Sequence, residues 1–172
     1  KFAVYALLNH DGDFKAAAAA LKAKGYGPQG RPSASTKMLK LVSDCELFHT
    51  PAGDPYAGVP VGKHRENYPV EGKQFKQWLA HRYYRQTKSA PSTMALSEAV
   101  NVVAAQARFD GPEIPVYTRL AESNGAIYHD LADEHWRAVE ITREGVDVVD
   151  EPPVKFRRPN GLLRLPHPEA EG

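Results

Sequence analysis

The clearest periodic pattern of hydrophobic positions lies in residues 72–88. Four apolar side chains recur there at spacings of i, i+3, i+4 and i+8: Phe75, Trp78, Leu79 and Tyr83. This spacing places side chains on one face of an α-helix, so the segment is predicted to form an amphipathic helix. Polar and cationic side chains occupy the opposite face. Arg82 falls within the apolar face, so we expect its guanidinium to form an ion pair or to extend towards solvent.

Two further helices are predicted from capping residues and apolar spacing. One covers residues 93–108, preceded by Pro91-Ser92-Thr93 and ended by Asp110-Gly111-Pro112. The other begins after Asp13, continues through five alanines and ends at Gly25. Aspartate is a favoured N-cap, alanine has the highest helix propensity, and glycine is common just after a helix.

Short apolar runs bounded by turn residues predict a series of strands. They lie at residues 46–50, 56–61, 66–70, 116–121, 126–131, 136–142, 146–149 and 154–157. Asn124-Gly125 joins two of these runs and is typical of a type I′ hairpin turn.

These elements predict an α+β fold, with an antiparallel sheet built from hairpins, two packed helices and a short N-terminal helical appendage. We assign residues 1–30 to the helical end of a preceding module and 31–45 to a linker with a short helix. Residues 46–158 are expected to form the α+β domain, and residues 159–172 an exit linker. The 172-residue length suits one domain with an appendage.

The formal net charge is only +1, but the charges are segregated along the chain. Residues 63–88 contain seven Lys/Arg against two Glu, whereas residues 110–151 contain eleven Asp/Glu against three Arg. Residues 152–164 contain four bases and no acid. Two basic segments therefore flank an acidic one, and a basic segment is a candidate for anionic partners.

The single cysteine, Cys45, excludes a disulfide within the chain and a cysteine-based metal site. The apolar start at residues 1–8 is too short to span a membrane and has no cleavage-site pattern. We interpret it as the last turns of a helix cut from a longer protein. We therefore expect a cytoplasmic protein with no membrane partner.

Cationic and aromatic side chains together predict contact with a nucleic-acid backbone and its bases. The candidate nucleic-acid-binding residues are Lys63, Arg65, Lys73, Lys76, Tyr84, Arg85, Lys88, Lys155, Arg157 and Arg158. A solvated helix face is the alternative explanation for the run within 72–88, because exposed helix faces are commonly charged. Trp78 and Tyr83 fall on the core face, which leaves Tyr84 as the stacking candidate.

The segment 129–135 is the densest cluster of metal-ligand residue types. His129, Asp133 and His135 have a spacing compatible with a two-histidine, one-carboxylate metal site. A solvated hairpin tip is the commoner use of such a segment, so we assign no metal. The chain also lacks the glycine-rich phosphate loop, the dinucleotide fingerprint and the nucleophile elbow. We expect no cofactor and no catalytic residues.

Several segments along most of the chain resemble one protein family. The first are residues 10–14, followed by the alanine-rich helix and Gly25-Tyr26-Gly27. The others are residues 46–51, 64–66, 75–79, 109–112, 127–131, 136–141 and 153–158. Together they resemble the region between the two catalytic modules in replication proteins of phages and bacterial mobile elements. That family couples a primase or primase–polymerase region to a C-terminal helicase-like ATPase.

The resemblance implies DNA replication, with DNA and the neighbouring primase and ATPase modules of the same parent chain as partners. No polymerase carboxylate pattern and no Walker lysine can be carried over, because this chain contains neither. We therefore expect a non-catalytic DNA-binding or connector domain of a primase–helicase replication protein. The alternatives are a protein–protein spacer that docks a helicase-like ATPase and a metal-dependent hydrolase or nuclease.

Overall fold

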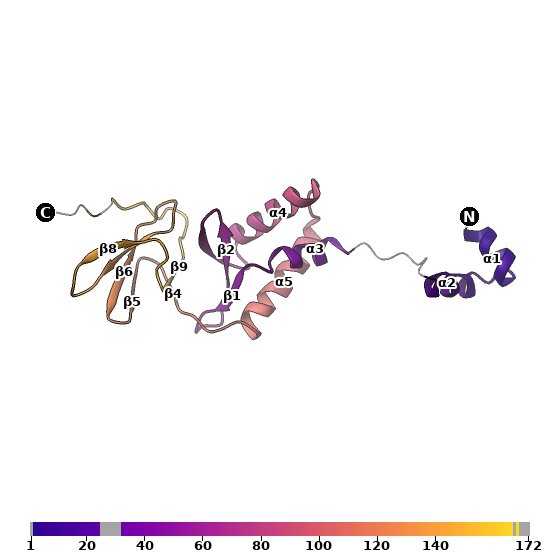
Figure 1. Ribbon diagram of the computed structural model, residues 1–172, viewed down its shortest axis with the longest axis horizontal. Helices are drawn as coiled ribbons and strands as arrows, with labels where there is room; N and C mark the ends of the chain where they lie inside the picture. Colours follow the sequence, from indigo (N-terminus) through magenta and orange to yellow (C-terminus); the bar gives the residue numbers. More distant parts are fainter. Residues whose placement is uncertain (1, 25–31, 167, 169–172) are drawn as a thin grey trace. The chain divides into compact units, whose positions relative to one another are not determined.

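The computed structural model describes residues 2–24, 32–166 and 168 (Figure 1). The chain divides into two compact units, residues 1–33 and 34–172, close to the boundary expected near residue 30. The first unit contains helices α1 (Phe2–His10) and α2 (Phe14–Ala23). Asp13 caps α2 as predicted: its Oδ1 accepts the backbone N–H groups of Lys15 and Ala16 at 2.8 and 3.0 Å. The expected glycine stop at Gly25 lies outside the described residues.

The second unit begins with a helix and a three-stranded sheet. The elements are α3 (Ala34–Leu41), β1 (Glu46–His49), β2 (Pro55–Val61) and β3 (His64–Pro69). The strands pair antiparallel in the order β1-β2-β3. Two long helices follow, α4 (Lys73–Thr87) and α5 (Thr93–Phe109), and Figure 1 shows them beside this sheet. The predicted α+β class is confirmed.

The first core lies between the helices and one face of this sheet. Phe75, Leu79 and Val103 are fully buried in it. Met38 of α3 and Val42 are buried in the same cluster, so α3 is part of the domain. Residues 34–45 therefore differ from the linker expected from the sequence, because their apolar side chains complete the core under α4 and α5.

The C-terminal half of the second unit holds the remaining strands. A four-stranded antiparallel sheet consists of β5 (Leu120–Ser123), β6 (Ala126–Asp130), β7 (Ala138–Ile141) and β8 (Val146–Val149). The positive φ angles of Asn124 and Gly125, 52° and 79°, fit the predicted type I′ turn between β5 and β6. A second core cluster on one face of this sheet includes Tyr128, Ala138 and Phe156.

Two features differ from the sequence-based expectation. The strand expected at 116–121 is divided into β4 (Val116–Tyr117) and β5, and β4 pairs in parallel with β9 (Lys155–Phe156). The segment after β9 also packs back on the domain: the N–H of Leu165 donates to the carbonyl oxygen of Leu131 at 2.9 Å. At least up to Leu165, the expected exit linker is therefore bound to the domain.

Among the residues that the structure describes, no helix combines the length and apolarity needed to cross a bilayer.

Candidate nucleic-acid interface

Helix α4 presents cationic side chains to solvent because its other face is fixed in the core. Phe75, Leu79 and Tyr83 are buried, which orients the helix about its own axis. Lys73 and Tyr84 are exposed on the opposite side, and Lys76 is exposed at the edge of the buried face, next to the groove with α5. Lys88 is the C-cap of the helix, with a left-handed φ of 56°. Arg85 is exposed one residue after Tyr84.

The sequence of α4 contains no Asp or Glu. None of the ion pairs formed within the described residues involves the cations of this surface. The cations are Lys73, Lys76, Arg85 and Lys88. Together with Tyr84 they form a surface that we call the α4 strip. Its positive charge is therefore available to an anion from outside the domain.

An open groove of about 420 Å³ lies beside the α4 strip. Lys73, Lys76, Gln77 and Ala80 of α4 line one side, and Leu96 of α5 lines the other. Cations beside an apolar floor match a polynucleotide, which presents phosphates and flat apolar bases together.

Arg82 is paired within the fold, as the sequence predicted. Its guanidinium donates to both carboxylate oxygens of Asp44 at 2.8 and 2.6 Å, and it also stacks on the Trp78 ring at 5.1 Å from the centroid. The hydrogen bond from Arg82 is the main reason that the pKa of Asp44 lies below its usual value. The Arg82–Asp44 ion pair connects α4 to the loop before β1 and stabilises the orientation of the α4 strip.

The other predicted cations of the first basic segment lie in the β2–β3 hairpin. Lys63 is exposed in the turn between the two strands. Arg65 donates through Nη1 to the carbonyl oxygens of Asp44 and Gly58, at 3.0 Å each. These bonds leave part of the Arg65 guanidinium for other acceptors, since arginine carries five donors.

The C-terminal basic segment is used mostly inside the domain. Lys155 Nζ lies 2.6 Å from Glu46 Oε2. Arg158, whose side chain is only 13% exposed, binds the buried carboxylate of Asp130 through Nε and Nη2 at 3.0 and 2.5 Å. Arg157 and Arg164 are exposed, and Nε of Arg157 donates to Thr118 Oγ1 at 3.4 Å. The structure therefore does not bring Lys155 and Arg158 to a free cationic surface.

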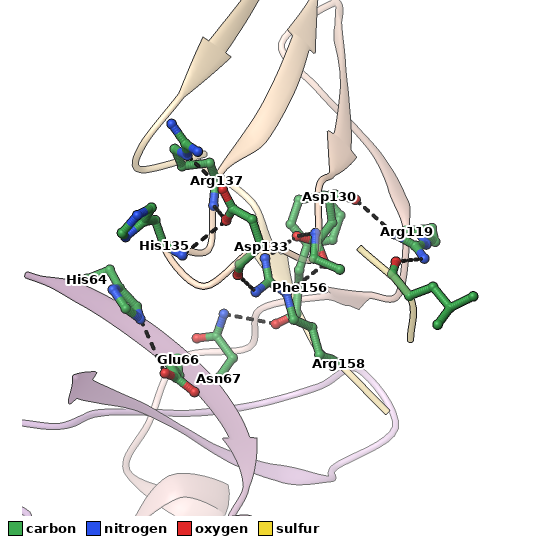
Figure 2. A network of polar contacts seen from close by, with 12 residues as sticks. His64, Glu66, Asn67, Arg119, Asp130, Asp133, His135, Arg137, Phe156 and Arg158 are labelled. Carbon is green, nitrogen blue, oxygen red and sulfur yellow. Dashed lines mark hydrogen bonds and ion pairs between the residues drawn. The ribbon is translucent and has the colours of Figure 1, made fainter. Parts of the chain in front are cut away.

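Two buried carboxylates organise the loop between β6 and β7 (Figure 2). Asp133 Oδ1 accepts the N–H groups of His135 and Arg137 at 3.1 and 3.0 Å, and its Oδ2 accepts Nε of Arg137 at 2.7 Å. Burial alone would raise the pKa of Asp133, but the bonds from Arg137 outweigh it and the pKa is lowered. Trp136 adopts a φ of +59°, rare for a bulky residue, and its ring lies 4.2 Å from the Arg158 guanidinium carbon.

The same geometry removes the support for the metal-site alternative. The Asp133 carboxylate already accepts three hydrogen bonds from Arg137 and the backbone N–H of His135, while the His135 side chain is exposed and lies 3.6 Å from Glu134. Across the described parts of the chain, no group of three or more His, Cys, Asp or Glu side chains is arranged to hold a metal ion. His129, Asp133 and His135 thus do not form the ligand set of the metal-site alternative.

Sequence reasoning missed the network around Asp130 and Arg158. The two residues are 28 positions apart in the sequence, so no local spacing indicates that they pair. The one available signal was the position of Asp130 in an alternating strand: it shares the inward face with Ala126 and Tyr128, and a carboxylate on that face requires a cationic partner.

Comparison with known proteins gives no match of this chain to a protein-family model, a curated protein or a solved structure. The resemblance to primase–helicase replication proteins therefore stays a prediction.

Proposed function

We propose that this chain is a non-catalytic connector of a primase–helicase replication protein, and that it binds DNA through the α4 strip. The observation that supports this proposal is the acid-free helix α4, which exposes cations beside an apolar groove. Phosphates would replace small counterions along the strip, and Tyr84 would stack on a base. The primase and ATPase modules would be the neighbours within the same parent chain.

The acidic segment supports the same orientation. Its carboxylates repel phosphates, so DNA approaching the α4 strip is kept away from the hairpins of β5 to β8. Lys63 and Arg157 are both exposed and are kept as candidates for further phosphate contacts. Lys155 and Arg158 have no part in this proposal, because their charges are paired within the domain.

The proposal is tested by binding of a fluorescent single-stranded oligonucleotide across a salt series. We expect binding that weakens steeply as salt rises, because each phosphate contact releases counterions. The variant Lys73→Ala/Lys76→Ala/Arg85→Ala should bind more weakly and with a flatter salt dependence. The matched control is Lys15→Ala/Lys22→Ala/Lys24→Ala, which removes three exposed positive charges from the first unit.

The control separates a specific surface from general charge attraction. If both triple variants lose affinity equally, the α4 strip is not the binding surface. If the unaltered chain does not bind at low salt, the DNA-binding proposal fails.

One observation favours the rival function, a protein–protein spacer that docks the ATPase. The register of β5 to β8 places a set of partly exposed aliphatic side chains on one sheet face: Leu120, Ile127, Ile141, Val146 and Val148. Contiguous exposed apolar surface is typical of protein interfaces. The spacer predicts that the chain ignores DNA at every salt concentration, so the same assay separates the two functions.

A further inference from the structure

A second site lies away from the α4 strip. A cavity of about 330 Å³ opens between the three-stranded sheet and the C-terminal segment. Glu46 and Asn67 of the sheet line it, together with Trp136, Val154 and the acidic pair Asp150 and Glu151. This volume is within the range of sites for small ligands or single side chains.

Asn67 supplies an unused hydrogen-bond acceptor in this cavity. The residue is only 8% exposed, and its Nδ2 donates to the carbonyl oxygen of Phe156 at 3.1 Å (Figure 2). Its Oδ1 is buried and has no hydrogen-bond partner among the described residues. Buried polar atoms are nearly always paired, so an unpaired carbonyl oxygen at a cavity indicates a missing donor.

Gly58 allows two acceptor side chains to approach each other across the sheet. Strand pairing aligns Glu46, Gly58 and Asn67 in one row across β1, β2 and β3. A Cβ added to Gly58 would lie 3.3 Å from both Asn67 Oδ1 and Glu46 Oε2. Two acceptor oxygens therefore flank a position without a side chain.

Three basic side chains also line this cavity, His64, Arg65 and Lys155, and two of them are paired with carboxylates. Lys155 is paired with Glu46, and Arg65 donates to backbone carbonyl oxygens. Asp150 and Glu151 are exposed, and they form none of the ion pairs found within the described residues. The charges without an ion-pair partner are Arg65 against Asp150 and Glu151, a net of 1 − 2 = −1, which together with the unused oxygen of Asn67 favours a cationic ligand with several donors.

We propose that this cavity binds an arginine side chain presented by a partner polypeptide. A guanidinium has five donors in a planar fork, enough to reach Asn67 Oδ1, a remaining lone pair of Glu46 and a carboxylate of the acidic pair. The methylene stem would lie along Val154 and the indole of Trp136. The site is independent of the DNA-binding proposal, because it shares no residue with the α4 strip.

The test is titration of the 172-residue chain with N-acetyl-arginine amide, followed by ¹⁵N–¹H NMR. Saturable shifts are expected for the Asn67 side-chain amide, the Gly58 backbone amide and the Trp136 indole N–H. N-acetyl-citrulline amide, which has nearly the same shape without the charge, should bind at least about tenfold more weakly. Free arginine should also bind more weakly, because its charged α-amino and α-carboxyl groups are strongly hydrated and have no counterpart in a polypeptide.

Two variants locate the site. Gly58→Ala should weaken binding at least about tenfold, because the added methyl group would press on Asn67 Oδ1 and Glu46 Oε2 and displace them. Its matched control is Gly145→Ala, in a turn where an added Cβ meets nothing within 4 Å. Asp150→Asn/Glu151→Gln changes only exposed side chains, so it tests the charge requirement even if Gly58→Ala does not fold.

The outcomes are distinct. Absence of shifts at these three groups, equal binding of the citrulline analogue, or full binding by both site variants would overturn the proposal. Binding of free arginine alone would overturn the polypeptide source. The triple α4 variant should retain arginine binding whether or not the chain binds DNA.

Discussion

Arg158 binds Asp130 in the interior of the C-terminal half, with Nη2 of the arginine 2.5 Å from Oδ1 of the aspartate. The carboxylate side chain is 1% exposed and the guanidinium side chain 13% exposed. Arg158 Nη1 also donates to the carbonyl oxygen of Asp133, and the guanidinium stacks on Trp136. One side chain near the end of the chain thereby fixes the loop between β6 and β7.

Arg158→Ala should lower the free energy of unfolding by about 3–5 kcal/mol, because it leaves the buried Asp130 carboxylate without a counter-charge. Arg157→Ala, at the neighbouring exposed position, should change it by no more than about 0.5 kcal/mol. Urea unfolding followed by circular dichroism measures both values. Equal effects of the two substitutions would contradict the structural role of Arg158.

The sequence predicted correctly those elements that depend on interactions between residues close together in the chain. The α4 and α5 helices and the hairpin turn at Asn124-Gly125 depend on nearby residues, and their patterns predicted them. The division of the 116–121 segment was missed, because β4 pairs with β9 from a distant part of the chain. A pattern of apolar positions contains no information about such a partner.

The candidate site shows the same limit. Exposure of Lys73 and Tyr84 could be predicted, because the apolar face of α4 fixes the opposite face. Pairing of Arg82 was also predictable from its place on that apolar face, although Asp44 as its partner was not. Lys155 and Arg158 look in sequence like the free cations of α4, and only the fold shows the carboxylates beside them.

Acid should destabilise the chain through Asp44 and Asp133. The pKa of each carboxyl is lowered in the folded state from the ordinary 3.8. A lowered folded-state pKa contributes stability that is present above the unfolded value and is lost as pH falls through the folded one. The urea midpoint should therefore stay level near neutral pH and fall below about pH 4.

Asp133→Asn provides the check on this pH dependence. The substitution should lower stability at neutral pH and reduce the drop between neutral and acid pH, since one of the two titrating groups is gone. An unchanged drop would assign the acid sensitivity to other carboxyls. The urea midpoint of each protein, measured at a series of pH values, decides between these results.

Cys45 should react slowly with Ellman's reagent in the folded chain. Burial is the main cause that raises the pKa of its thiol to about 12, and the nearby Asp44 charge adds to it. The thiolate is the reactive form, so at about pH 8 its fraction is roughly a thousandfold below that of an ordinary thiol of pKa about 8.5. Absorbance should show slow labelling in buffer and fast labelling in guanidinium chloride. Fast labelling of the folded chain would show that the thiol is accessible and unperturbed.

Tyr84 distinguishes base stacking from charge attraction on the α4 strip. The residue is 52% exposed between the cations of the helix, and base–aromatic stacking contributes about 1–3 kcal/mol per base. Tyr84→Ala should therefore weaken binding of a single-stranded oligonucleotide by about 5- to 150-fold without changing the slope of the salt dependence, since no charge is removed. Tyr84→Phe keeps the ring and should retain most of the affinity.

The Lys73→Ala/Lys76→Ala/Arg85→Ala variant should instead reduce the log–log slope by about 2, because each single-strand phosphate contact contributes about 0.7. Fluorescence anisotropy across a salt series measures both quantities for each variant. If Tyr84→Ala binds like the unaltered chain while the triple variant does not, the strip holds phosphates alone and the stacking role is wrong.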